Sequence, residues 1–196
     1  MKKFLGELWR LVLITFLGFA GGMIAGLMIY GGEIFSPQSA GFAYYVMYGV
    51  STAFIFAFYH VRGLSNTITA AVVTGAIIFV IASFWMPVLN SAIWSFGVNL
   101  SVIVLAFLFE RKLAYFKQWK FIVIGIIYGG VFVLVTLLIG IFTKVADLPP
   151  ALFRQNFLDG LWLGVGLGIG VEIAESIIHS VDLYWIAKHE AMKDNL

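Results

Sequence analysis

The sequence predicts an all-α integral membrane protein, built as a bundle of six transmembrane helices, and two observations indicate this class. Of the 196 residues, 62% are hydrophobic and only 11% are charged, whereas soluble globular domains carry about 25% charged residues. The stretches 11–30 and 121–143 contain no Asp, Glu, Lys or Arg. Each is about as long as the roughly 20 residues that cross a hydrocarbon core as a helix.

The apolar stretches divide the chain, taken as a single transmembrane domain over 1–196, into six spans. The first stretch follows Lys2 and Lys3, as in a signal peptide. Its apolar part is too long for a signal sequence, so we expect a retained helix. The remaining spans follow from windows of high hydropathy between short connections. The predicted spans are 8–30, 42–60, 67–86, 92–109, 121–143 and 157–181.

The distribution of positive charge predicts how these spans are oriented. With the N-terminus in the cytoplasm, only Lys144 and Arg154 of the 12 Lys and Arg residues lie on the outer side. Cytoplasmic connections are typically enriched in Lys and Arg. An even number of spans then places both termini in the cytoplasm. The expected location is the inner or plasma membrane of a prokaryotic cell.

Glycines recur at helical spacing in the first, fifth and sixth predicted spans. Residues four apart share a helix face, and small residues allow helix backbones to approach closely in lipid. We expect these glycines to pack the three spans together at the centre of the bundle; the alternative is that some of them mediate homodimerisation. The predicted packing glycines are Gly18, Gly22, Gly26, Gly125, Gly129, Gly160, Gly164 and Gly168.

The sixth span carries the ionisable residues that suggest a function. Glu172, Glu175, His179 and Asp182 fall on one face of a helical wheel. Both glutamates lie within the hydrocarbon thickness, where ionisable residues are costly and mark ion or substrate pathways. Two carboxylates one turn apart resist ionising together, and a proton or a cation relieves that repulsion. We therefore predict that Glu172 and Glu175 bind a proton, a cation or a cationic solute, with His179 near the cytoplasmic mouth.

Other interpretations of the same residues remain open. The acidic residues of the sixth span can instead belong to a structural ion-pair network. Its candidate members are Arg10, Arg62, Arg111 and Asp182. The Glu175 and His179 pair has no matching pair on another span, of the kind that di-iron bundles use, so we predict no metal. A haem held by His60 and His179 has only their similar depth in its favour.

Composition and motifs exclude several classes of function. The chain has no cysteine, which excludes thiol nucleophiles, disulfides and cysteine-ligated metals. It carries no catalytic motif, and its basic residues follow the topology instead of forming a nucleic-acid-binding patch. We predict no enzyme activity, no cofactor and no nucleic-acid partner. The expected function is a small carrier or channel whose partners are the lipid bilayer, a small cation or cationic solute, and other copies or membrane subunits.

In overall plan the chain resembles the substrate-binding S components of energy-coupling-factor vitamin transporters. The shared plan covers the whole chain: 196 residues, six predicted helices and both termini inside. This resemblance implies an alternative function as a non-catalytic membrane subunit of a larger complex. In that family a small-residue motif on the first helix meets the coupling partner, a role that the resemblance implies for Gly18, Gly22 and Gly26. The family motif is spaced by alanine, whereas this chain has glycine.

Overall fold

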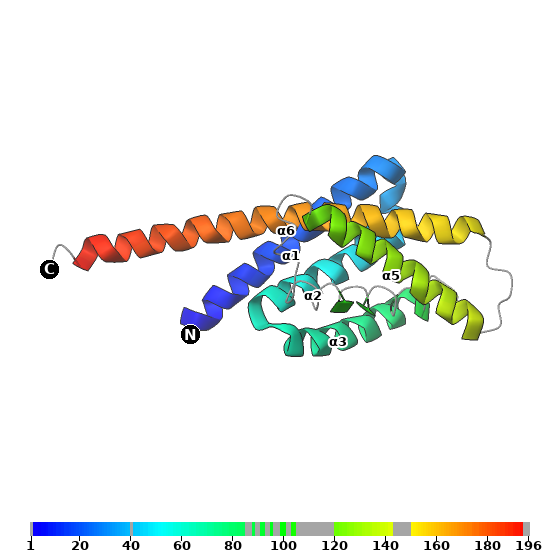
Figure 1. Ribbon diagram of the computed structural model, residues 1–196, viewed down its shortest axis with the longest axis horizontal. Coiled ribbons are helices and arrows are strands. Elements are labelled where there is room, and N and C mark those ends of the chain that lie inside the picture. The colour runs from blue at the N-terminus through cyan, green and yellow to red at the C-terminus, as the bar shows by residue number, and fades with distance from the viewer. Residues whose placement is uncertain are drawn as a thin grey trace.

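The computed structural model describes residues 2–39, 41–84, 88, 91–92, 95, 99–100, 103–104, 120–142 and 150–193 (Figure 1). Within this part of the chain the protein is all-helical and contains no strand, which confirms the all-α part of the predicted fold class. Most of the predicted span 92–109 lies outside the described residues, as does the candidate charge partner Arg111. The elements are α1 (Lys2–Tyr30), η1 (Gly31–Phe35), η2 (Phe42–Met47), α2 (Tyr48–Arg62), α3 (Leu64–Ala82), α5 (Lys120–Phe142) and α6 (Pro150–Lys193).

Two of the described helical stretches, Leu5–Phe35 and Arg154–Ala187, are long and apolar enough to cross a membrane. The apolar stretches Asn66–Ala82 and Ile122–Leu134 are shorter. Many large apolar side chains point outward from these helices, among them Met28 and Ile141, which are 81% and 71% exposed. Such a surface suits contact with lipid, because an apolar patch of this extent is rare on a soluble monomer.

Helix α6 is the element on which the others are assembled. Both α1 and α5 pack along it, and α2 packs between α1 and α3. In Figure 1, α6 runs the full width of the molecule and α1 crosses it, with both ends of the chain on the same side. Its 44 residues extend about 66 Å at 1.5 Å per residue. The helix therefore continues well past residue 181, where the sixth span was predicted to end.

The contact between α1 and α6 depends on three glycines. Each faces backbone atoms of the other helix, where a side chain would have no room. A Cβ atom built at Gly21 would collide with the carbonyl oxygen of Gly166, and one built at Gly166 would collide with that of Gly21. A Cβ atom at Gly170 would collide with the carbonyl oxygen of Leu17. Backbone cannot move aside as a side chain can, so only glycine permits this separation of the two helices.

The contact between α5 and α6 uses glycines from both helices. A Cβ atom at Gly164 would lie 2.7 Å from the Cα atom of Gly125, and one at Gly160 would lie 2.9 Å from that of Gly129. The four glycines thus face one another in pairs. Backbone groups of two helices approach closely through this kind of spacing.

The remaining predicted packing glycines have different neighbours. Gly18 faces the side chains of Val171 and Ala53. Gly22 and Gly26 leave room for large side chains, because their Cβ atoms would lie 2.9 Å from Leu163 Cδ1 and 2.5 Å from Tyr45 Cγ. Gly168 is buried in α6. Cβ atoms at Gly18, Gly22 and Gly26 would therefore meet side chains, whereas one at Gly21 would meet the backbone of α6.

We expect Gly21→Ala to lower the free energy of unfolding by about 1–3 kcal/mol, because the added methyl group forces α1 away from α6. The matched control is Gly6→Ala on the same helix, where a Cβ atom would meet nothing within 4 Å. Thermal unfolding of the purified protein in detergent measures both. The packing account is contradicted if both variants melt at the same temperature.

Candidate functional site

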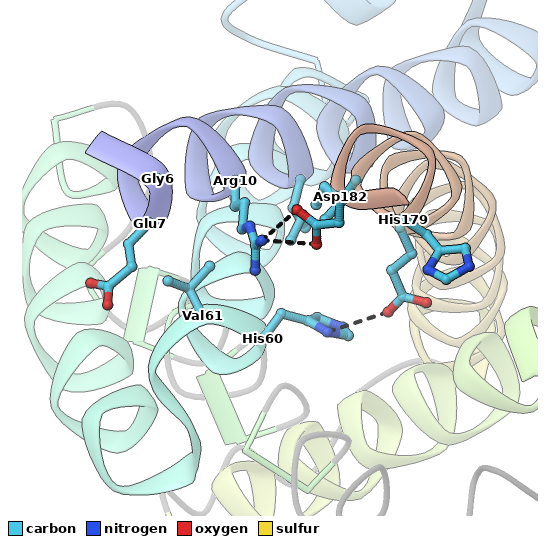
Figure 2. Close-up of a pocket in the computed structure, with 10 residues that line it drawn as sticks. Gly6, Glu7, Arg10, His60, Val61, His179 and Asp182 are labelled. Carbon is cyan, nitrogen blue, oxygen red and sulfur yellow. Dashed lines mark hydrogen bonds and ion pairs between the residues drawn. The ribbon is translucent and has the colours of Figure 1, made fainter. Parts of the chain in front are cut away.

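Side chains from three helices line one cleft, at the end of the bundle where α1 begins and α2 ends (Figure 2). The cleft has a volume of about 570 Å³. Its lining is unusually rich in ionisable groups for a chain of this composition. The lining residues are Gly6, Glu7, Arg10 and Ile14 of α1, His60 and Val61 of α2, and Glu175, Ile178, His179 and Asp182 of α6.

The local sequence explains why polar side chains of α2 and α6 lie in the cleft. Helix α2 stops at Gly63, whose φ of 79° is in the region that glycine adopts without strain. The N–H of Gly63 donates to the carbonyl oxygen of Tyr59 at 2.8 Å, which closes the last turn and fixes His60 within it. On α6, Glu175, His179 and Asp182 follow one another at spacings of four and three, which keeps them on one side.

The strongest contact in the cleft joins the beginning of α1 to α6. Arg10 Nη2 donates to both carboxylate oxygens of Asp182, at 2.7 and 2.8 Å. Each side chain is 41% exposed, so water screens the pair and its net contribution to stability is about 0.5–1 kcal/mol. The pair holds the two helices together at the mouth of the cleft, as Figure 2 shows.

Two more charge pairs surround the same cleft. Arg62 Nη2 lies 2.7 Å from Glu7 Oε2 and thereby ties the end of α2 to the beginning of α1. His60 Nδ1 lies 3.3 Å from Glu175 Oε1, in a less exposed position, with 21% and 33% of the two side chains accessible. The first pair joins two permanent charges at neutral pH. The second joins a carboxylate to an imidazole, whose charge depends on its protonation.

The structure separates the residues that the sequence placed in one site. Glu175 and His179 line the cleft together with Asp182, whereas Glu172 is exposed on α6 and is not among the lining residues. The buried side of α6 explains this separation. With Gly160 at zero, the buried side chains of Leu163, Leu167, Val171 and Ala174 point between about 300° and 20°, while Glu172 points to about 120° and Glu175 to about 60°.

Two ionisable cleft residues were predicted neither as part of the cation site nor as charge partners of it. Glu7 was not singled out, and His60 was considered only as a haem ligand. Their positions depend on how α1, α2 and α6 meet, which no spacing within one helix reveals. Among the described residues, no group of three His, Asp or Glu side chains lies close enough to hold a metal ion.

A buried polar network at the opposite end of α6 was also missed. Asp159, which is 1% exposed, accepts hydrogen bonds from the hydroxyls of Tyr30 and Tyr45 at 2.9 and 3.2 Å. The side-chain amide of Gln155 donates to the same carboxylate at 2.9 Å. The sequence offered one signal, an aspartate inside an apolar stretch, but its position near a predicted helix start explained it equally well.

A second cavity lies between α3 and the described residues of 92–103. It has a volume of about 510 Å³ and is lined largely by apolar groups, with Ser95 and Asn99 as its polar members. The absent side chain of Gly75 leaves room for the amide group of Asn99, which packs directly against it. This cavity offers no charged group from the described residues and contributes nothing to the cleft.

We expect Arg10→Gln and Asp182→Asn to be non-additive, because each single change breaks the same pair. A double-mutant cycle on the free energy of unfolding should give a coupling energy of about 0.5–1 kcal/mol. Arg154→Gln paired with Asp182→Asn is the control, since Arg154 lies near the other end of α6. Additive effects of Arg10→Gln and Asp182→Asn would show that the contact does not form in solution.

Comparison of the chain with protein-family models, with curated proteins and with solved structures finds no match.

Proposed function

We propose that this chain is a six-span membrane protein with both termini in the cytoplasm, and that its cleft binds a proton, a small cation or a cationic solute. The convergence of ionisable side chains from α1, α2 and α6 on one cleft carries the proposal. The two helical stretches that are long enough to span a membrane contribute two of these three sets of side chains. The distribution of Lys and Arg along the sequence then favours a cytoplasmic position for the cleft.

The balance of charge in the cleft favours a cationic ligand. Three carboxylates, those of Glu7, Glu175 and Asp182, line it. Arg62 pairs with the first and Arg10 with the third, whereas Glu175 pairs with an imidazole. A cation entering this cleft therefore meets a net attraction, whereas an anion meets a net repulsion when the two histidines are neutral.

The pair of Glu175 and His60 gives the cleft a link between cation binding and protonation. A protonated imidazole favours the carboxylate of Glu175, at the separation of 3.3 Å, in the same way that a bound cation does. Protons and cations consequently compete for one position. A carrier that exchanges one for the other needs this competition, whereas a structural ion pair does not.

Glu175→Gln should weaken binding of a probe cation by about tenfold or more, because a charge-assisted contact contributes about 1.5–3 kcal/mol. Binding of Na⁺ and of tetraphenylphosphonium to the purified protein provides the measurement, by titration calorimetry. Glu33→Gln is the matched control, since Glu33 is exposed on η1. Glu172→Gln locates the site: a loss equal to that of Glu175→Gln would place the site outside the cleft.

His60→Gln should flatten the pH dependence of that binding. In the wild-type protein, a protonated imidazole places a positive charge beside Glu175 that competes with the cation, so affinity falls as pH falls. Glutamine retains hydrogen-bonding groups but carries no titrating charge. An unchanged pH profile in His60→Gln would show that the imidazole does not compete with the ligand.

A second candidate function, a non-catalytic membrane subunit, is favoured by the last turns of α6. Leu183, Tyr184, Trp185 and Ile186 are consecutive and each more than half exposed, at 51–62%. Consecutive residues cover all sides of a helix, so this segment presents apolar surface in every direction. Native mass spectrometry of the protein from its own membranes tests this role. A stoichiometric complex with other chains, lost in Tyr184→Ser/Trp185→Ser, would support the subunit role over the carrier.

A further inference from the structure

Asp159 is a buried carboxylate that the proposed cation site does not use. It lies 16 residues before Glu175 on α6, or about 24 Å along the helix axis at 1.5 Å per residue. Only 1% of its surface is exposed. An isolated charge in such a position is costly, and the cost is reduced only by partners that compensate the charge.

Among the described residues, the hydrogen-bond partners of the Asp159 side chain come from three elements and are all neutral. Oδ2 accepts from the hydroxyl of Tyr30 of α1 and from the amide of Gln155 of α6, and Oδ1 accepts from the hydroxyl of Tyr45 of η2. On α5, Tyr128 packs on Gly160 and shares a hydrogen bond with Thr52. The hydroxyl of Tyr44 of η2, which also lies near Asp159, donates to Asn156 of α6. No Lys, Arg or His forms an ion pair with Asp159 in the part of the chain that the structure describes.

A continuous set of hydrogen bonds links this carboxylate to the surface. The amide of Gln155, whose side chain is exposed, donates to the hydroxyl oxygen of Tyr30 at 2.8 Å. The same hydroxyl donates to Asp159 Oδ2 at 2.9 Å. Tyr30 is itself partly exposed, so its hydroxyl can exchange a proton with water on one side and with the carboxylate on the other.

We infer that Asp159 is a proton-binding site, distinct from the cleft, whose unprotonated form holds α1, η2 and α6 together at the opposite end of the bundle. Both oxygens of a carboxylate act only as acceptors, whereas a protonated oxygen becomes a donor and keeps less acceptor capacity. When Asp159 takes up a proton, its own O–H becomes a donor and must find an acceptor. The contacts with Tyr30 and Tyr45 then rearrange, and α1, η2 and α6 pack less tightly at this end of the bundle.

Infrared difference spectroscopy of the purified full-length protein tests the proton site. A carboxylic acid has a C=O stretching band that its carboxylate lacks, so a pH titration should show one such band that disappears in Asp159→Asn. Tyr30→Phe keeps the carboxyl group and removes one donor, so the band should shift in frequency and persist. Glu33→Gln, an exposed carboxylate on η1, should leave it unchanged. The proposal is overturned if the wild-type protein shows no pH-dependent carboxylic acid band that is lost in Asp159→Asn.

The absence of cysteine in the sequence allows a direct test of the closure. Ile34 of η1 is fully buried at 0% exposure and contacts Gly26 near Tyr45. In an Ile34→Cys protein, Asp159→Asn should raise the rate of thiol labelling several-fold, because an amide imitates the protonated acid. Ile178→Cys, in the cleft, should label at an unchanged rate. Equal labelling rates of Ile34→Cys with and without Asp159→Asn would overturn the role of Asp159 in holding α1, η2 and α6 together. Neither test uses a cation, so a negative result in either one does not contradict the proposed cation site in the cleft.

Discussion

The close approach of α1 and α5 to α6 through glycine is the constraint on which the rest of the structure depends. On one side, Gly21 and Gly170 bring the backbones of α1 and α6 into contact, and on the other, Gly125 and Gly164 do the same for α5 and α6. In lipid there is no hydrophobic driving force between helices, so close packing supplies the attraction. The crossing also fixes the register of α1 against α6, which is why Arg10 reaches Asp182 at one end and Tyr30 reaches Asp159 at the other.

This arrangement gives α6 two polar regions separated by an apolar middle. One is the open cleft, where Glu175 pairs with His60 and charges meet water. The other is the buried network around Asp159, in which every described partner is neutral. A carrier of the proposed kind needs an opening at one end and a closure at the other, because a solute must be exposed to one side at a time.

The sequence predicted local features well and interhelical relations poorly. Composition predicted the all-α class, because apolar stretches of this length have few alternatives. Helical periodicity singled out Gly125, Gly129, Gly160 and Gly164, which do face one another. It missed Gly166 and Gly170. A helical wheel of α6 alone does not show which of its glycines pack against α1 and which pack against α5. For the same reason it grouped Glu172 with Glu175, although only the second turns toward the cleft, and it could not connect Asp159 to tyrosines over a hundred residues away.

The most direct test of the central claim is the side of the membrane from which the cleft is reached. Ile178 lines the cleft between Glu175 and Asp182, and a single cysteine there can be reacted with a membrane-impermeant thiol reagent in inside-out and right-side-out vesicles. The account predicts labelling from the cytoplasmic side only, slowed by a cation that occupies the cleft. Labelling from the outer side, or equal labelling from both sides, would contradict it.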